Sequence, residues 1–484
     1  MNAPATEGLH LPDGYSREVG AAFENWDFSR LPGEVAHRIK LFVLDTLGVI
    51  GAAANAEGIA ALNRRLSRWE PSGPSTALIG KWTASPPTAA LANGAAAHAL
   101  DFDDNHDPAR VHSYAVILPA ALAAAEEQGG VSGRRFITAL ACGVELQCRL
   151  GLASPRSLSR GWHPTTVLGT IGAAASVATL LGLRGDEFLH ALGLAYHQAA
   201  GTRQALNDGV LAKRLGPGFS ARSGTLAAYL ASDGLTGPTR FLEGEAGLFR
   251  LYEREDVVPA RVLEGLGQAW DLMTHSMKPY GCCRCTHNAI DIGIALHKEG
   301  IVPDTIDDVA IGMGLTNTKI VGAPYEPARN APVHAQFNAC YCFASALVHG
   351  RVGLDTFQRP QIQDAPVAAL AAKARVVVDD RIDPGAMSPT RVTVKLRDGQ
   401  SIERFLEFMK GSPEDPMSEV EVRTKFASCL RSGLDARETV IDRLAETVLA
   451  LEELDDVKSL VALFPKMPSA KSKDTRTLQD HVRA

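Results

Sequence analysis

The residues best suited to acid–base chemistry gather in one stretch, 98–119, which reads HALDFDDNHDPARVHSYAVILP. Alanine-rich runs precede and follow it, so a loop here would be held rigidly between two packed helices. Carboxylates and imidazoles packed in such a loop perturb each other's pKa values, as general acid–base catalysis requires. A solvated acidic loop with a helix cap is the alternative interpretation. The titratable candidates in this stretch are Asp101, Asp103, Asp104, His106, Asp107, Arg110 and His112.

Two further stretches carry a histidine and a lysine close to glycines. In the sequence GWHPT, His163 precedes a proline that predicts a helix start. A helix N-terminus favours a neutral imidazole and attracts anions, although a cap or a core histidine is the alternative. Residues 201–224 resemble a glycine-rich loop that carries Lys213, Arg214 and Arg222. Taken alone, such a lysine is more typical of a solvated surface.

The fourth stretch, 278–287, places three cysteines and a histidine close together in the sequence KPYGCCRCTH. This composition suggests a metal site, but zinc is commonly bound by two separated pairs of ligands. Cys282 and Cys283 are adjacent, and two adjacent cysteines cannot easily both bind one ion. We therefore expect this cluster to be structural and to hold no metal.

The composition and the missing motifs exclude several classes of function. The 484 residues are 45% hydrophobic and 21% charged, as in ordinary globular proteins, and the net charge of −6 provides no basic surface for nucleic acid. We find no signal peptide, no apolar run long enough to span a bilayer and no disulfide framework. A cytoplasmic protein without membrane or nucleic-acid partners is therefore expected. Walker A, H-E-x-x-H, G-x-S-x-G and dinucleotide-binding G-x-G-x-x-G motifs are also missing.

Most of the chain has helical periodicity. Apolar residues three and four apart predict a helix over 35–47, and Pro86 begins an alanine-rich helix that ends at the central loop. Further helices are expected over 133–150, 164–178 and 186–200. The frequent glycine and alanine in these helices predict close helix packing.

The pattern changes in the last 210 residues or so. Residues 305–314 resemble a strand, 334–349 resemble a helix, and an Asp-Gly pair at 398 marks a hairpin between two alternating stretches. Helical periodicity returns from Gly411. We therefore predict a mainly α fold, in which both chain ends form a large all-helical domain and a smaller α+β lid domain is inserted. The expected parts are a helical domain over 1–275, the lid over 276–410, and a return to the helical domain with a C-terminal tail over 411–484.

Taken together, these stretches resemble the MmgE/PrpD family over roughly residues 20–465. Several motifs in the right order are more specific than any one of them. The Lys213-Arg214 pair is more similar to fungal decarboxylase-like members than to dehydratases. The matching motifs are HALDFDD at 98, His112 with Leu118-Pro119, GWHPT at 161, Lys213 with Ala221-Arg222-Ser223-Gly224, Lys278 with Cys283 and His287, and GSPEDPM at 411.

The resemblance implies a homodimer that needs no metal or other cofactor and acts on a small di- or tricarboxylic acid. Its matched positions imply catalytic roles for Asp101, His112, His163, Lys213 and Lys278. Substrate-binding roles are expected for Asn105, His106, Arg222 and His287.

We therefore expect a metal-independent lyase of the cis-aconitate decarboxylase or 2-methylcitrate dehydratase type. Lys213, Lys278 and protonated histidines would bind the carboxylates of the substrate. His112 and His163 would move protons at carbon, and Asp101 would orient or charge one of them. Two alternatives stay open. One is an epimerase or isomerase of an imino- or amino-dicarboxylate, and the other is a non-catalytic carboxylate-binding protein.

Overall fold

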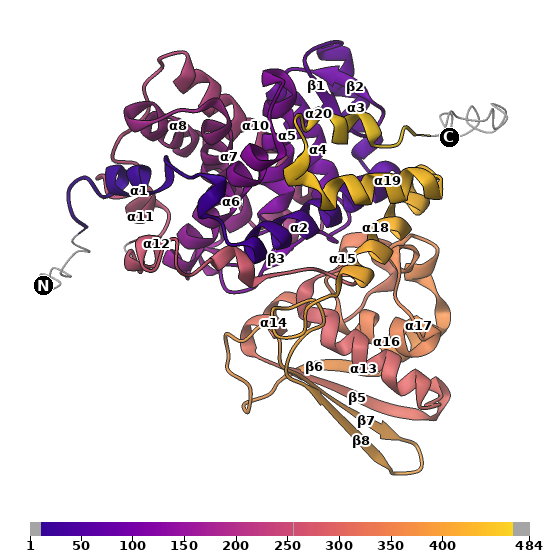
Figure 1. The fold of residues 1–484 in the computed structure, drawn as a ribbon. Helices are drawn as coiled ribbons and strands as arrows, with labels where there is room; N and C mark the ends of the chain where they lie inside the picture. The colour runs from indigo at the N-terminus through magenta and orange to yellow at the C-terminus, as the bar shows by residue number, and fades with distance from the viewer. Residues whose placement is uncertain (1–10, 255, 468–484) are drawn as a thin grey trace, which may run out of the picture.

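Two large hydrophobic cores divide the part of the chain that the structure describes. The computed structural model describes residues 11–254 and 256–467. The larger core joins helices from both ends of the chain, and the smaller core is built from residues between 282 and 394. Figure 1 shows the helical part above and the smaller α+β unit below it. The predicted mainly α class is confirmed, whereas the tail expected over 468–484 lies outside the described residues.

The helices before the α+β unit, apart from the short α9, contribute residues to the larger core. They are α1 (Tyr15–Phe23), α2 (Gly33–Ala52), α3 (Ile59–Trp69), α4 (Pro86–His98), α5 (Tyr114–Gln128), α6 (Gly133–Ala153), α7 (Pro164–Leu181), α8 (Gly185–Gln198), α9 (Gln204–Asn207), α10 (Ala212–Ser232), α11 (Leu248–Leu251) and α12 (Ala260–Leu263). The later helices are α13 (His287–Lys298), α14 (Leu315–Val321), α15 (Pro332–Gln336), α16 (Ala339–His349), α17 (Ala365–Ala371), α18 (Glu419–Leu434), α19 (Glu438–Leu449) and α20 (Lys458–Leu463).

Helices α6 and α7 form the centre of the larger core. By length and composition both could cross a membrane, and the bent pair of residues 33–55 with α3 would be a third candidate. In the structure, however, 94% of the apolar stretch of α6 and of α7 is buried inside the molecule. Their backbones meet at Gly143 and Gly172, where a Cβ on Gly143 would lie 2.5 Å from the Gly172 carbonyl oxygen. Burial on all sides explains why α7 is apolar all round, whereas α6 also carries the exposed Arg134 and Arg135 and a buried ion pair of Glu145 with Arg149.

Helix α10 corrects one prediction. Residues 201–224 were expected to be a loop, but they contain the short α9, and α10 begins at Ala212 and continues through Pro217. The glycines here are packing positions, because a Cβ on Gly218 would lie 2.5 Å from the carbonyl oxygen of Leu91 on α4. The expected loop residue Lys213 therefore lies in the first turn of a helix.

The α+β unit is built on a four-stranded sheet in the order β6-β5-β7-β8. The pair β5–β6 is parallel and the other two pairs are antiparallel. Helices α13 and α16 pack in the core on one face of the sheet, on its upper side in Figure 1. The predicted hairpin at Asp398 is present, and Gly399 supplies the positive φ of the turn. The strands of the described residues are β1 (Ser75–Ala77), β2 (Trp82–Ala84), β3 (Asn105–His106), β4 (His275–Ser276), β5 (Ile306–Met313), β6 (Ala374–Val378), β7 (Thr390–Leu396) and β8 (Ser401–Leu406).

The chain returns to the helical part beside the point where it left. The backbone N–H of Met277 donates to the carbonyl oxygen of Gly411 at 2.9 Å, so the two connections run next to each other. Helix α18 then packs on α2, where Lys425 pairs with the buried Asp45 at 2.7 Å. Figure 1 shows α18, α19 and α20, in yellow, against the helices of the N-terminal part.

We expect Gly433→Ala to destabilise the fold. Gly433 lies where α18 contacts α2, and a Cβ there would lie 2.0 Å from the carbonyl oxygen of Gly51. Because a backbone carbonyl, unlike a side chain, cannot rotate away from the added Cβ, α18 and α2 would have to move apart. The expected loss is about 1–3 kcal/mol in the free energy of unfolding, measured by urea denaturation.

Gly33→Ala is the matched control. Gly33 is the first residue of α2, and a Cβ there would have no heavy atom within 4 Å. The free energy of unfolding should stay unchanged or rise by up to about 1 kcal/mol. Equal denaturation midpoints for the two variants would contradict the proposed packing.

Candidate active site

One buried carboxylate, that of Asp101, lies at the centre of the site. It follows α4 with a φ of 53°, in the left-handed region that aspartate tolerates better than most residues. Lys278 donates from Nζ to Asp101 Oδ1 at 2.9 Å and to the carbonyl oxygen of the same residue at 3.0 Å. The Nζ of Lys213 lies 3.4 Å from Asp101 Oδ2. All three side chains are less than a tenth exposed, so these ion pairs are shielded from water.

The two lysines determine the charge of this carboxylate. Burial would raise the pKa of the Asp101 carboxyl, but Lys213 and Lys278 outweigh burial and hold that pKa well below its usual value. Burial would lower the pKa of Lys278, and Asp101 and Asp103 raise it instead. At neutral pH, therefore, Asp101 is ionised and Lys278 is a cation.

A second buried carboxylate, Asp103, binds two histidines. His98 Nδ1 lies 2.7 Å and His112 Nδ1 lies 3.3 Å from the same oxygen, Asp103 Oδ2. His112 Nδ1 also lies 2.6 Å from the carbonyl oxygen of Asp104. On its other side, His98 Nε2 lies 3.0 Å from Lys213 Nζ. Hydrogen bonds thus connect the Asp103 carboxylate to the Asp101 centre.

Two histidines of the site, His112 and His163, are neutral at neutral pH. Burial lowers the pKa of His112 to about 3, although Asp103 opposes this shift. Burial, followed by the nearby His98 and Lys213, holds the pKa of His163 well below its usual value. The expectation that protonated histidines would bind substrate carboxylates is therefore wrong for these two residues.

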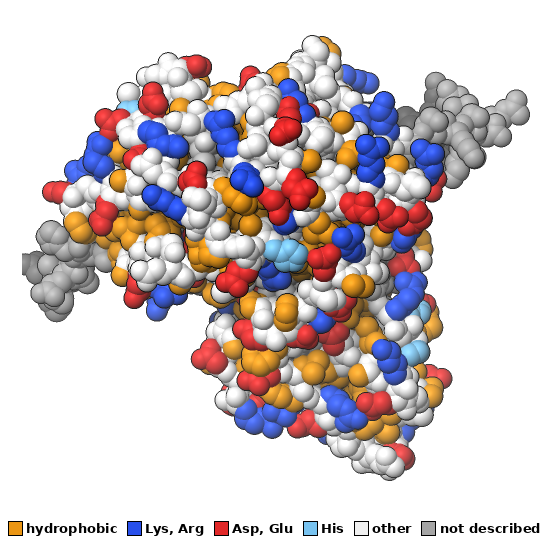
Figure 2. All heavy atoms as spheres, viewed as in Figure 1, with side chains coloured by type: hydrophobic (Ala, Val, Ile, Leu, Met, Phe, Trp, Pro, Cys, Tyr) orange, Lys and Arg blue, Asp and Glu red, His pale blue; other side chains and the backbone are white. Residues whose placement is uncertain are grey.

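A hollow of about 460 Å³ lies between the helical part and the α+β unit, and a smaller one of about 230 Å³ lies beside the lysine on α10. Lys213 and His163 line the smaller hollow together with Arg203 and Phe219. The His163 ring centroid lies 6.2 Å from that of His98. On the face drawn in Figure 2, acidic and basic side chains are interspersed.

The structure brings the five expected catalytic residues together, although they come from separate segments. It also places two residues that sequence analysis did not assign, His98 and Asp103, between them. Both lie within the motif HALDFDD, five residues apart across the end of α4. The spacing of this histidine and this aspartate in the motif was the signal by which the sequence could have indicated their contact. The five expected residues are Asp101, His112, His163, Lys213 and Lys278.

The expected substrate-binding residues do not all reach the site. Asn105 is buried on β3, and its side-chain amide donates to Asp107. Arg222 is exposed on α10, nine residues after Lys213, which places it on the opposite side of that helix. His287 is buried beside Arg284, with its Nδ1 3.2 Å from the guanidinium, while its Nε2 has no partner among the described residues.

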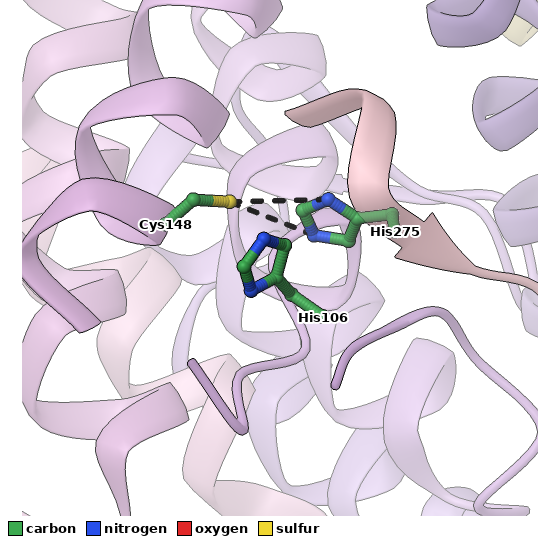
Figure 3. Close-up of side chains that lie close together, drawn as sticks. All are labelled: His106, Cys148 and His275. Carbon is green, nitrogen blue, oxygen red and sulfur yellow. Dashed lines mark hydrogen bonds between the residues drawn. The ribbon is translucent and has the colours of Figure 1, made fainter. Parts of the chain in front are cut away.

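His106 belongs to a different buried cluster, with Cys148 and His275 (Figure 3). Its Nδ1 accepts from the N–H of Ala109 at 3.0 Å, and its Nε2 lies 2.7 Å from Thr274 Oγ1. Both nitrogens are therefore used within the protein, and the expected contact with substrate does not fit this placement.

The cluster in Figure 3 has three side chains of metal-binding type, but its geometry does not suit a metal. The Cys148 sulfur lies 3.8 Å from His275 Nδ1 and 3.9 Å from His275 Nε2, so it faces the ring rather than one lone pair. Burial also raises the pKa of the Cys148 thiol well above its usual value, which disfavours the thiolate that a metal needs. This cluster is better described as packed core.

The group of His98, Asp103 and His112 could also be considered for a metal. Both histidines direct Nδ1 at one carboxylate oxygen, which is the arrangement of two N–H donors sharing an acceptor. A cation there would also lie near Lys213 and Lys278. The arrangement is suited to holding and moving protons.

Comparison with known proteins covers both cores. The chain matches the MmgE/PrpD N-terminal domain over residues 19–259 and the MmgE/PrpD C-terminal domain over residues 280–451. A cis-aconitate decarboxylase-like protein of Aspergillus oryzae is 31% identical over 90% of this chain and 94% of that protein. A cis-aconitate decarboxylase of Aspergillus terreus is 28% identical over 93% of this chain and 96% of the relative. The cis-aconitate decarboxylase of Homo sapiens is 27% identical, over 94% and 96% respectively.

The buried neutral His112 predicts an acid-sensitive fold. Its pKa is lowered from about 6.5 in an unfolded chain to about 3, so its contribution to stability is present above about pH 6.5 and is lost as the pH falls toward 3. His112→Asn keeps an amide donor but cannot titrate. Between pH 7 and 4 this variant should lose less free energy of unfolding than the wild type, by up to roughly 3 kcal/mol.

Urea denaturation at a series of pH values measures this difference. His197→Asn, at an exposed position on α8, is the control and should follow the wild-type pH dependence. If His112→Asn and the wild type lose stability in parallel, His112 is not held neutral by burial.

Proposed function

Because the chain belongs to the MmgE/PrpD family, we propose that it is a metal-independent lyase that decarboxylates a small unsaturated tricarboxylic acid of the cis-aconitate type. The observation that carries this proposal is that Lys213 and the neutral His163 line the same hollow, where Lys213 also lies 3.4 Å from the buried Asp101. The relatives named cis-aconitate decarboxylase support the substrate class.

Decarboxylation of such an acid needs a proton donor rather than a redox partner. The bond between carbon and the departing carboxylate breaks, CO₂ leaves, and the electron pair shifts through the neighbouring double bond. A proton then adds at the far carbon of that double bond. The net reaction consumes one proton per CO₂, so an acid must deliver a proton to carbon.

Lys213 is the best candidate for this acid. His112 and His163 are neutral at neutral pH and have no extra proton to give as imidazolium. Lys278 makes two contacts with Asp101 and is almost completely buried. Lys213, by contrast, lines the hollow.

The remaining groups have supporting roles in this proposal. The guanidinium of Arg203 lines the same hollow and can pair with a substrate carboxylate. His163 can hydrogen-bond the substrate without adding charge, so it polarises a carboxylate and orients it. Lys278 holds Asp101 in place, and Asp101 in turn keeps Lys213 at the hollow.

Incubation of the purified protein with cis-aconitate, citrate, 2-methylcitrate and iminodisuccinate in D₂O, followed by NMR, tests the reaction. We expect cis-aconitate to lose CO₂ and gain one deuteron at carbon. Exchange or epimerisation of a dicarboxylate without CO₂ release would indicate that the protein is an isomerase and not a lyase. Turnover of none of the four acids would overturn the proposal.

Lys213→Met and His163→Gln should each lower kcat by about 10²–10⁴-fold, since each removes a positioned proton donor or hydrogen-bonding group. Lys319→Met, at an exposed position on α14, is the control for loss of a lysine and should keep wild-type kcat. Steady-state kinetics and thermal unfolding of each variant distinguish lost chemistry from lost folding. Wild-type kcat in Lys213→Met would exclude Lys213 as the acid.

Activity should survive metal removal, because protons and lysine charges supply the chemistry in this proposal. We expect unchanged kcat after dialysis against EDTA and no stoichiometric zinc or iron by elemental analysis. Activity that is lost with EDTA and restored by one metal ion per chain would contradict metal independence.

A further inference from the structure

His98 links the proposed acid to a buried carboxylate. Its Nδ1 lies 2.7 Å from Asp103 Oδ2, and its Nε2 lies 3.0 Å from Lys213 Nζ. The His98 and Asp103 side chains are completely buried, and the Lys213 side chain is 9% exposed. Water therefore cannot easily replace either contact.

Asp103 determines which nitrogen of His98 carries the proton. Burial would raise the pKa of Asp103, but His98 and His112 outweigh it and hold the pKa below its usual value. An ionised carboxylate can only accept a hydrogen bond, so His98 Nδ1 must be the donor. The lone pair of Nε2 then faces Lys213, which can donate to it.

No other described side chain offers Lys213 an equally short hydrogen bond. Asp101 Oδ2 lies at 3.4 Å, and Asp101 already receives the shorter bond from Lys278. The third neighbour is the Phe337 ring, whose centroid lies 5.1 Å from Lys213 Nζ. A lysine has four flexible carbon–carbon bonds, so a fixed acceptor is needed to hold its ammonium in one place.

We propose that His98, with its tautomer fixed by Asp103, is a positioning residue that holds the Lys213 ammonium at the hollow. The role in turnover rests on the proposed function, whereas the hydrogen bond itself does not. One N–H of Lys213 is directed at His98, and the ion pair with Asp101 is longer, at 3.4 Å, so the ammonium keeps N–H groups for substrate. His98 acts through Lys213 and does not itself reach the reacting carbon.

Two amide variants test the roles of the two ring nitrogens of His98 separately. In His98→Asn the amide occupies the place of Nδ1, so the contact with Asp103 is kept and the acceptor for Lys213 is lost. In His98→Gln the amide reaches the place of Nε2 and can still accept from Lys213. His106→Asn, in the separate cluster of Figure 3, is the control for loss of a buried histidine.

The first measurement needs no substrate. Brief exposure to acetic anhydride at a series of pH values acetylates only unprotonated amines, and mass spectrometry gives the labelling midpoint of Lys213. We expect His98→Asn to lower this midpoint by about one pH unit or more, because the ammonium loses a charge-assisted hydrogen bond. His98→Gln and His106→Asn should keep the wild-type midpoint. An unshifted midpoint in His98→Asn would overturn the proposal.

The second measurement is steady-state turnover. His98→Asn should lower kcat by about 10²-fold with KM changed only a few-fold, and His98→Gln should recover most of the loss. If His98 had a purely structural role, kcat would instead fall to the same extent in both variants, in parallel with their thermal unfolding midpoints. If the labelling midpoint shifts but the protein decarboxylates none of the acids, the proposed function is wrong. The positioning of Lys213 by His98 would still be supported.

The third measurement uses the wild-type protein and does not depend on any variant that fails to fold. A neutron crystal structure locates deuterons directly. We expect one deuteron on His98 Nδ1, none on His98 Nε2 and three on Lys213 Nζ. A deuteron on Nε2 would show the opposite tautomer and would overturn the proposal.

Discussion

The pairing of the buried Asp101 with two lysines is the interaction on which the rest of the site depends. A carboxylate removed from water is stable only when cations and hydrogen-bond donors replace its hydration. Lys278 comes from the junction with the α+β unit and Lys213 from α10, so the pairing ties distant segments to the end of α4. The same pairing determines the charges that surround the neutral histidines.

Close helix packing makes this arrangement attainable. Helix α10 approaches α4 so closely that a Cβ on Gly218 would collide with the backbone at Leu91. That approach brings the first turn of α10, and with it Lys213, to within hydrogen-bonding distance of His98 at the end of α4. The small residues of the sequence thus determine the geometry of the candidate site and do not merely fill the core.

The sequence was sufficient for the helical class, the hairpin at Asp398 and the family, because these depend on local periodicity and on motif order. It was misleading for α10, since glycine and proline mark loops as well as close helix contacts. It left His98 and Asp103 unassigned, because their importance depends on the approach of Lys213, 115 residues later in the chain than His98. It placed His106 near substrate, whereas the pairing of β3 with β4 directs that ring into a separate cluster. Each difference between the predictions and the structure therefore results from tertiary contacts.

The paired connections at Met277 and Gly411 are the point about which the α+β unit would turn if it moved relative to the helical part. The chain enters and leaves the unit at this one place, and Lys278 lies directly beside it. In a rotation about such a point, displacement grows with distance, as along a lever arm. The far strands β7 and β8 would travel most and Lys278 least. The hollow between the two parts could thus widen to admit a molecule while the ion pair with Asp101 stayed closed.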